Sequence, residues 1–313
     1  MKRWIWQYEN YPHFTYQFEK LEHLLQKISM EQGYLLALSQ TLSQDTILQR
    51  QCDALLNETL STAAIEGEIL NRDSVKASIA KKFGLREIDD KKIVDSTDNL
   101  VSILIDANTN YDKALTLERL FGWHNALFPK GYSGLRKINT ASFRGEETMQ
   151  IVGGSMGKEI VYYEAPPRDR LEQEMQRFLA WFNSEKPTLI KACIAHLWFV
   201  IIHPFDDGNG RITRVITDLV LSNIENSKIS RLYSMSSTIN EHRKAYYTAL
   251  ENTTGYIQKD GDALDITLWC EWFLNTLYQA LLDARGRLNH IVFKTQFWDK
   301  HRDQPLNARQ IKV

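Results

Sequence analysis

The sequence predicts a mainly α-helical protein that carries one small β-hairpin. Apolar residues recur at helical spacing through most of the 313 residues, and 43% of the chain is hydrophobic, enough for a sizeable core. Glycines gather in one stretch, residues 131–167, where short alternating segments replace the helical pattern. The length fits two domains, or one large helical domain with appendages.

The first third of the chain predicts an arm followed by three helices. Residues 4–16 are rich in aromatics without helical spacing, so we expect an irregular arm packed on the body. Residues 16–42 predict a helix because Phe18, Leu21, Leu24, Leu25 and Ile28 share one helical face. A second helix is expected over residues 47–72, with Gly67 inside it, and a third over residues 71–84, ending at Gly84.

The remaining segments are assigned in the same way. Residues 93–129 predict one or two helices, and residues 131–167 predict a hairpin-like excursion with strands near 137–143 and 159–164. Further helices are expected at residues 168–183, 191–203, 211–224, 241–253 and 265–289. A final helix is expected to begin after Pro305, so we expect the natural chain to continue beyond Val313.

Composition narrows the class of protein. A formal net charge of -1 gives no general attraction to nucleic acid or acidic membranes. Cys52, Cys193 and Cys270 form no disulfide framework, the histidines show no HxxxH pair, and no signal peptide or membrane span is visible. We therefore expect a soluble, cytoplasmic protein.

The stretch IIHPFDDGNGRITR, residues 201–214, has the composition of a site rather than of a core. His203 ends a buried apolar helix, and Gly208-Asn209-Gly210 leads into the next one. The first N–H groups of a helix attract anions, and glycines allow a close approach, so this turn resembles a phosphate cradle. Arg211 and Arg214, three residues apart, add guanidinium groups for further phosphates.

Two other residues complete the predicted chemistry. Asp207 is an oxygen ligand suited to Mg²⁺, which takes one or two carboxylates and fills its shell with water and phosphate. His203 is the natural general base, since imidazole is mostly neutral near pH 7. Neither the Walker A pattern nor a complete GxGxxG motif is present. Together these residues describe attack by a hydroxyl group on a nucleotide phosphate.

Residues 203–214 also match the pattern HPFx[DE]GNGRxxR at every specified position, and the chain resembles the Fic family in this segment. The resemblance implies a Fic-fold helical bundle that transfers AMP from ATP to a Ser, Thr or Tyr hydroxyl of a protein. It implies His203 as base, Asp207 as Mg²⁺ ligand, Gly208 to Gly210 as anion hole, and Arg211 and Arg214 as phosphate ligands. Phe205 and Asn209 belong to the same phosphate-binding motif.

The resemblance extends to neighbouring segments. Residues 131–167 resemble the Fic flap, whose edge aligns the target peptide by strand addition. Residues 231–250 resemble the segment over the adenine, with Tyr246 or Tyr247 stacking on the base. The aromatic arm is similar to that of a bacterial subgroup that carries a C-terminal winged helix, so DNA is expected as a partner only if such a domain lies beyond Val313. A homodimer is expected.

The segment STAAIEGE, residues 61–68, resembles the family's inhibitory pattern [ST]xxxE[GN] through Thr62, Glu66 and Gly67. By this resemblance Glu66 pairs with Arg214 and denies the γ-phosphate its arginine. We accordingly divide the chain into an inhibitory helical region (1–92), a Fic domain (93–290) and a tail that starts a winged helix (291–313).

Three alternatives stay open at this point. Glu66 could activate a water that removes AMP from a modified protein. The fold could instead sense nucleotide in a DNA-associated regulator, a role disfavoured by the near-zero net charge. Transfer of a different phosphate-containing group is the third alternative, and the complete motif favours AMP over it.

Overall fold

The computed structural model describes residues 4–85, 92–153, 160–225, 232–255 and 264–301, and it confirms a mainly helical fold. The helices are, in chain order, α1 (Phe18–Ser39), α2 (Gln44–Ile65), α3 (Arg72–Lys82), α4 (Asp95–Thr109), α5 (Leu117–Leu127), α6 (Leu171–Ser184), α7 (Leu189–Ile202), α8 (Asn209–Glu225), α9 (Met235–Glu241), α10 (Arg243–Thr254) and α11 (Thr267–Lys300).

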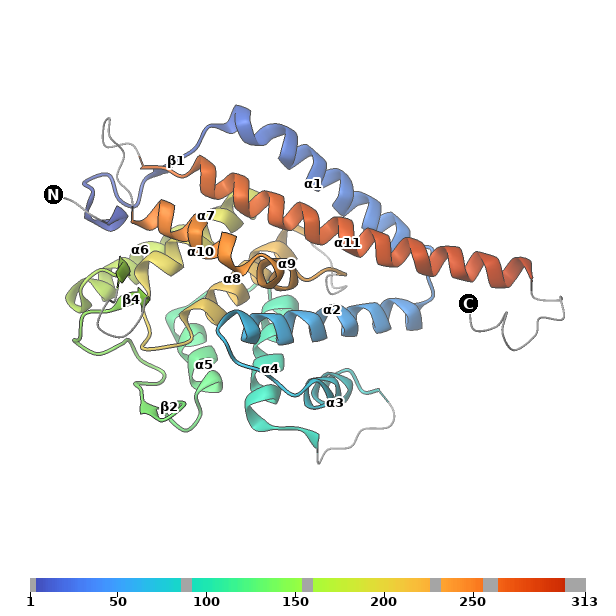
Figure 1. Cartoon of the computed structure of the whole chain (residues 1–313), viewed down its shortest axis with the longest axis horizontal. Coiled ribbons are helices and arrows are strands. Elements are labelled where there is room, and N and C mark those ends of the chain that lie inside the picture. The colour runs from blue at the N-terminus through green and yellow to red at the C-terminus, as the bar shows by residue number, and fades with distance from the viewer. Residues whose placement is uncertain (1–3, 86–91, 154–159, 226–231, 256–263, 302–313) are drawn as a thin grey trace.

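The core lies around α7, whose residues 195–202 are all buried. Helix α8 packs against α7, while α1 and α11 lie side by side across one side of the molecule and α2 to α5 occupy the other (Figure 1). The two helices that flank the 203–208 segment are therefore held by the most buried part of the fold. A site built at their junction has a rigid support.

Local signals explain where most helices begin. The side chains of Ser43, Asn71, Thr116 and Thr188 accept the backbone N–H three residues on, and so cap α2, α3, α5 and α7. Gly84, at φ +65°, follows α3 as expected for a glycine that ends a helix. The aromatic arm is irregular as predicted, apart from a single turn at Ile5–Gln7 and the short strand β1 (Phe14–Thr15).

The prediction of one helix over residues 47–72 was wrong at its C-terminal end. Helix α2 stops at Ile65, and Gly67 adopts φ +83° outside it. This left-handed conformation is accessible to glycine without a Cβ clash, and it turns the chain sharply after Glu66. The turn frees residues 66–70 from the helix and brings two glutamates, Glu66 and Glu68, to the same side of the molecule as the 203–214 segment.

The predicted excursion contains two separate two-stranded sheets rather than one hairpin. Strands β2 (Tyr132–Ser133) and β3 (Arg136–Lys137) pair antiparallel, as do β4 (Gln150–Gly153) and β5 (Ile160–Glu164). The strand expected at 159–164 is thus confirmed from residue 160, whereas the one at 137–143 is wrong beyond Lys137. In that segment the backbone N–H of Asn139 is donated to a side chain of the 203–208 loop, so it is not available to a partner strand.

The last helix also differs from the prediction. Helix α11 starts beside β6 (Leu264–Asp265), which pairs parallel with β1, and it runs to Lys300 instead of ending near 289. No proline lies between Thr267 and Pro305, and Gly286 is tolerated inside the helix. The helix therefore crosses the boundary that we placed at residue 290. The winged-helix expectation for the end of the chain concerns residues 302–313, which lie outside the described residues.

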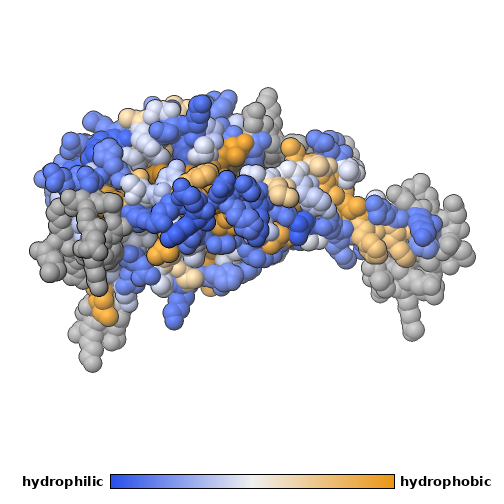
Figure 2. Space-filling model, turned by 90° about the horizontal axis from the view of Figure 1, so that it is seen from above, coloured by the Kyte–Doolittle hydropathy of each residue, from blue (hydrophilic) through white to orange (hydrophobic). Residues whose placement is uncertain are grey.

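Figure 2 looks down on the side formed by α1 and α11, where hydrophilic side chains predominate. Large exposed apolar side chains on these two helices include Leu36, Phe293 and Phe297. The three cysteines form no disulfide, as expected, and all three are buried. Among the described helices, none combines the length and the apolar character that crossing a membrane requires.

Candidate functional site

The site begins at the junction of α7 and α8. His203 follows α7 in the left-handed conformation, at φ +50° and ψ +58°. A residue with a Cβ pays about 1–2 kcal/mol for this conformation, so neighbouring contacts must hold it. The loop then reverses direction, and α8 starts at Asn209. The free N–H groups of the first turn of α8 are thereby brought beside the His203 side chain.

The loop between the two helices is fixed from inside. Asn209 accepts a hydrogen bond from the Phe205 N–H (2.9 Å) and donates one to the Phe205 carbonyl (2.8 Å). The Phe205 ring is fully buried and stacks on His124 at 4.2 Å. Phe205, which we expected among the phosphate-binding residues, therefore shapes the loop by packing, with its side chain in the core. Gly208, at φ +80°, cannot carry a Cβ because that atom would lie 2.8 Å from Phe128.

His203 is prepared to act as a base. Its Nδ1 lies 3.3 Å from the Val200 carbonyl, so a proton on Nδ1 is donated there and Nε2 keeps its lone pair. Burial lowers the pKa of His203 from 6.5 to about 4, and the cation of Arg144 acts in the same direction. The imidazole is therefore neutral at physiological pH.

Arg214 is buried and held by the end of α2. Its Nε donates to Thr62 Oγ1 (2.7 Å), and its Nη2 donates to the Thr62 carbonyl (2.9 Å) and to Glu66 Oε1 (2.7 Å). Burial, the largest single influence, opposes the charge, but Glu66, Tyr246 and Tyr247 together raise the pKa of Arg214 above its ordinary value. The predicted pairing of Arg214 with Glu66 is thus present, and the two bonds to Thr62 were not predicted. Arg214 Nη1 is buried and, among the described residues, has no hydrogen-bond partner.

Glu66 also occupies the entrance to the first turn of α8. A Cβ added to Gly210 would collide with the Glu66 carboxylate and would lie 3.2 Å from Arg214 Nη1. The carboxylate therefore lies against the glycine whose lack of a side chain opens the cradle. A negative charge at a helix N-terminus is stabilising, which is also the reason that a phosphate would bind there.

The first arginine of the motif has a different acidic partner. Arg211 Nη1 donates to Glu68 at 2.8 Å, and its guanidinium lies 4.9 Å from the centre of the Phe128 ring. Asp207 Oδ1 is 4.0 Å from Arg211 Nη2. Each motif arginine is thus paired with a carboxylate, one from each side of Gly67, and phosphate binding by the two arginines stays a prediction.

The two aspartates of the loop have separate surroundings. Asp207, the predicted Mg²⁺ ligand, is 43% exposed and accepts hydrogen bonds from Ser133 and the Gly208 N–H. Within the described residues, no cluster of three or more His, Cys, Asp or Glu side chains is arranged around a metal position. Asp206 accepts the backbone N–H groups of Asn139 (2.8 Å) and Gly145 (3.2 Å) and so anchors the start of the excursion.

A cavity of about 640 Å³ lies over these groups. Its lining includes Glu66, His203, Gly210 and Tyr247, together with Ile151 and Val152 of β4. Tyr247 is 40% exposed and donates its hydroxyl to the Ile65 carbonyl, which leaves its ring at the cavity wall. Tyr246 is only 2% exposed and its hydroxyl lies 3.0 Å from His196 Nε2. Of the two tyrosines, Tyr247 has the accessible ring that stacking on a base requires.

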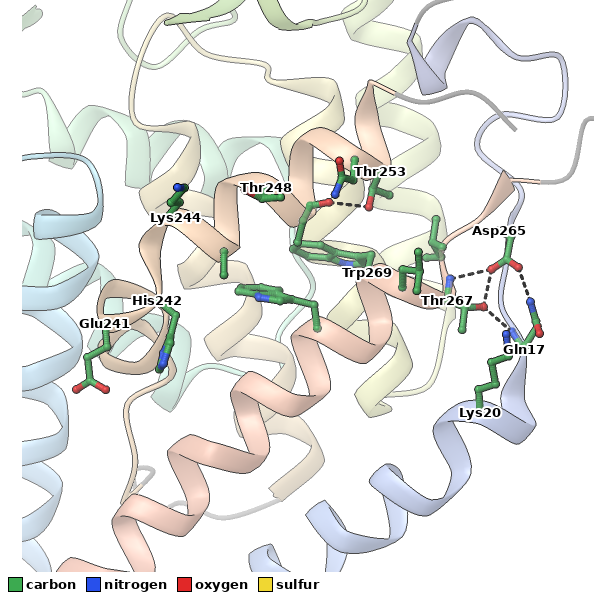
Figure 3. A pocket seen from close by; sticks show the side chains of 16 residues that line it. Gln17, Lys20, Glu241, His242, Lys244, Thr248, Thr253, Asp265, Thr267 and Trp269 are labelled. Atoms are coloured by element: carbon green, nitrogen blue, oxygen red, sulfur yellow. Dashed lines mark hydrogen bonds between the residues drawn. The ribbon is translucent and has the colours of Figure 1, made fainter. Parts of the chain in front are cut away.

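A larger hollow, of about 930 Å³, lies on another side of α10. Figure 3 shows Trp269 at its floor, Lys244 and Thr248 on α10, and Asp265 hydrogen-bonded to Thr267 and Gln17 at its far end. None of the residues 203–214 lines this hollow. We therefore assign the chemistry to the smaller cavity, where His203 and the start of α8 meet.

Some site residues were missed by the sequence reasoning. Glu68 was within the quoted segment 61–68, but the turn at Gly67 that aims it at Arg211 was not predicted. Arg144 is 2% exposed and binds the carbonyl of His203, although it lies 59 residues away in the chain. A charged residue in a glycine-rich loop gives no signal of burial, so only the fold could reveal this contact.

The fold thus brings His203, the start of α8 and Glu66 together at one cavity, and Arg211 and Arg214 follow on α8. Residues 114–221 match the Fic/DOC family, and residues 4–85 match a second family described as Domain of unknown function (DUF4172). The chain therefore contains a Fic/DOC family domain, which includes the whole 203–214 segment.

Similar proteins agree with this assignment. "Protein adenylyltransferase Fic" of Culex quinquefasciatus is 25% identical over 263 residues, covering 82% of this chain and 47% of that protein. The chain thus spans about half the length of that relative. "Uridine 5'-monophosphate transferase" of Xanthomonas campestris pv. campestris is 29% identical over 123 residues, 34% of this chain and 21% of that protein.

Solved structures show the same fold. A Fic family protein from Desulfovibrio desulfuricans aligns with a TM-score of 0.63 at 24% identity, covering 88% of this chain and 77% of that one. Fic-1 from C. elegans aligns with a TM-score of 0.58 at 17% identity, covering 87% and 74%. The predicted Fic-fold helical bundle is therefore confirmed.

Proposed function

We propose that this chain is a protein adenylyltransferase that moves AMP from ATP to a Ser, Thr or Tyr hydroxyl of a target protein, and that Glu66 restrains it. The observation that carries this proposal is the meeting of a neutral His203, the first turn of α8 and the ring of Tyr247 at one cavity. The similarity to a named protein adenylyltransferase over 82% of this chain adds support.

In the proposed reaction, the phosphates of ATP lie over Gly208 to Gly210 and the adenine stacks on Tyr247. The target hydroxyl gives its proton to His203 Nε2 as its oxygen attacks the α-phosphorus. A new oxygen–phosphorus bond forms, the bond from the α-phosphorus to the bridging oxygen breaks, and pyrophosphate leaves. Arg211 and Arg214 neutralise charge on the outer phosphates, and positioning supplies most of the rate enhancement.

The low pKa of His203 fits this role once nucleotide charge is considered. The value of about 4 belongs to a site in which burial is the largest influence. Several negative charges on bound phosphates would raise the pKa of an adjacent imidazole towards neutrality and so make Nε2 a stronger base.

Asp207 fits a magnesium site of the kind that forms with substrate. One partly exposed carboxylate beside an anion cradle is the donor set Mg²⁺ uses when phosphates and water complete its shell. Bound Mg²⁺ would neutralise phosphate charge there. Ser133 and the Gly208 N–H orient the Asp207 carboxylate, while Asp206 is engaged by the excursion and is not available as a second ligand.

The target peptide would lie along β4. Within the described residues β4 pairs only with β5, and the side chain of Val152 is 53% exposed beside the cavity. A free strand edge offers backbone hydrogen bonds to an extended peptide of almost any sequence. Such pairing would hold a Ser, Thr or Tyr of the target at the mouth of the cavity, close to His203.

Autoinhibition follows from the position of Glu66. Its carboxylate takes the Arg214 N–H group that an outer phosphate would use, and it lies against Gly210. ATP that binds while Glu66 stays in place would have its α-phosphate misaligned for in-line attack. The [ST]xxxE[GN] pattern lies N-terminal to the Fic motif, so the restraint would act within one chain.

Intact-mass spectrometry tests the proposal. The wild type, Glu66→Gly and His203→Ala would each be incubated with ATP and Mg²⁺, alone and with a mixture of candidate acceptor proteins. We expect gain of AMP with Glu66→Gly, little with the wild type and none with His203→Ala. Equal AMP incorporation by Glu66→Gly and His203→Ala would refute His203 as the base.

Two parallel incubations address the alternatives. UTP replaces ATP in the first, because one similar protein is named for uridine 5'-monophosphate transfer; gain of UMP without gain of AMP would change the donor and keep the site. In the second, an adenylylated acceptor is given to the wild type and to Glu66→Gly. Loss of AMP that requires Glu66 would instead support removal, with Glu66 activating a water beside Gly210.

A further inference from the structure

We propose that Arg144 is a positioning residue. It holds His203 in its left-handed backbone conformation and ties it to both ends of segment 144–166, the part of the excursion that carries β4 and β5. This inference rests on the proposed function, because His203 matters only if it is the base. Arg144 belongs to neither the 203–214 motif nor the inhibitory segment, and none of its atoms lines the cavity.

Three hydrogen bonds place Arg144. Its Nε donates to the carbonyl of His203 at 3.0 Å, and its backbone N–H donates to the carbonyl of Pro204 at 2.9 Å. Its Nη2 donates to the carbonyl of Pro166, at the other end of the excursion. One residue thus joins the two ends of the segment that carries β4 and β5 to the two peptide units that follow α7.

The burial of Arg144 indicates that its hydrogen bonds do more than fill space in the core. Its side chain is 2% exposed, yet no carboxylate among the described residues forms an ion pair with it. A buried guanidinium bound only by carbonyl groups is costly, and protein cores commonly avoid it. Burial lowers the pKa of Arg144, and nearby Arg168 lowers it further, while Asp206 and Glu146 act against both at longer range.

The backbone geometry of His203 explains why a buried guanidinium at Arg144 is useful. With φ at +50°, His203 is one of two residues other than glycine that have positive φ in the described chain. His203 is the residue that ends α7, where carbonyl groups have no N–H donor within the helix, and Arg144 Nε supplies the donor instead. If that donor is lost, the peptide can rotate towards an ordinary conformation and carry the imidazole away from the start of α8.

Variants of Arg144 in the Glu66→Gly background test the inference. Arg144→Met removes the donors and keeps an unbranched side chain, Arg144→Lys keeps the charge but cannot reach both carbonyls, and Arg136→Met is the control. Arg136 lies on β3, its side chain is 64% exposed, and its ion-pair partner is the exposed Glu147 of the same excursion. We expect kcat to fall about 10- to 100-fold in Arg144→Met, with the KM for ATP changed less than about threefold. Arg144→Lys should recover part of the loss, and Arg136→Met should match its parent.

A second measurement keeps this inference separable from the proposed function. Histidine labelled with ¹³C and ¹⁵N reports the ring tautomer and the Cα and Cβ shifts of His203, assigned by comparison with His203→Gln. We expect Arg144→Met to change the backbone shifts of His203 and to mix the two tautomers, whether or not the parent transfers AMP. Unchanged His203 signals would overturn the proposal, and so would a KM that rises as much as kcat falls.

A second inference follows from a different contact: we infer that Glu68 is a separate restraint on the site, acting through Arg211. Glu68 Oε2 lies 2.8 Å from Arg211 Nη1, and the Arg211 side chain is 10% exposed. Gly67 separates Glu68 from Glu66, and its φ of +83° turns the two carboxylates onto the two motif arginines. A nucleotide would then have to displace two carboxylates, one for each guanidinium.

Affinity for a non-hydrolysable ATP analogue tests the second inference without requiring activity. Glu68→Gln should tighten binding about 2- to 10-fold, both in the wild type and in the Glu66→Gly background, because the partly exposed pair is a modest one. Glu22→Gln, on the exposed face of α1, is the matched control and should leave the affinity unchanged. No effect of Glu68→Gln in either background would overturn the inference.

Discussion

Removing the carboxylate of Glu66 should release the site by an amount that the structure lets us work out. Glu66 Oε1 lies 2.7 Å from Arg214 Nη2, in a pair whose arginine side chain is 2% exposed and whose glutamate is 33% exposed. A charged hydrogen bond with one buried partner contributes about 1.5–3 kcal/mol. If a phosphate must displace that bond, Glu66→Gly should raise kcat/KM for AMP transfer by about 10- to 150-fold.

The assay is single-turnover incorporation of radiolabelled AMP at ATP concentrations below saturation, which reports kcat/KM. Glu66→Gln, which keeps an acceptor oxygen but loses the charge, should fall between the wild type and Glu66→Gly. Equal kcat/KM for all three proteins would refute the reasoning. A rise in Glu66→Gln as large as in Glu66→Gly would show that charge, rather than the hydrogen bond, carries the whole restraint.

The same substitution should have an opposite effect on stability. Without Glu66, Arg214 keeps only its bonds to Thr62, and a buried cation without its carboxylate destabilises the fold. We expect Glu66→Gly to lower the free energy of unfolding by about 1–3 kcal/mol, a range reduced because Glu66 is partly exposed. An ATP analogue should restore the stability of the variant more than that of the wild type. Equal thermal unfolding of both proteins without nucleotide would contradict this account.

Further predictions concern the base, the adenine and pH. His203→Ala should lower kcat about 10²- to 10⁴-fold with ATP affinity retained by calorimetry, and a loss below tenfold would exclude a general base. Tyr247→Ala should weaken ATP binding about 10-fold through lost stacking, whereas a change confined to kcat would contradict that role. Because burial lowers the pKa of His203 and of His124 to about 4 and that of His196 to about 3, the unfolded chain binds more protons below pH 6.5. The free energy of unfolding should therefore have its full value above about pH 6.5 and fall by up to about 4 kcal/mol per pH unit towards pH 4. A free energy of unfolding that does not change with pH in urea denaturation would refute this prediction.

Much of the site could be predicted because its residues lie close together in the sequence. His203, Gly208, Gly210 and Arg214 fall within twelve residues at the junction of two helices whose apolar periodicity is clear, so local rules fix their relative placement. The pairing of Glu66 with Arg214 depended on the resemblance, since a contact across 148 residues has no local signal.

The errors arose where backbone hydrogen bonds leave the local segment. Residues 137–143 alternate like a strand, but the N–H of Asn139 binds Asp206, and the N–H groups of Arg144 and Gly145 just after the segment bind Pro204 and Asp206, so tertiary contacts replace a ladder. Helix α2 was extended too far because a glycine within a helical pattern does not reveal the sign of its φ. Residues whose role is to hold others, such as Arg144, cannot be recognised by residue type alone.

The contacts of Gly210 and Arg214 connect inhibition with catalysis. The lack of a Cβ at Gly210 leaves room for an anion at the first turn of α8, and the Glu66 carboxylate uses that room. Because a phosphate needs the same space and the same guanidinium, nucleotide and inhibitor exclude one another at these atoms. The hydrogen bonds of His203 are to Val200 and Arg144 rather than to Glu66, so we expect release of Glu66 to leave those hydrogen bonds of the base in place.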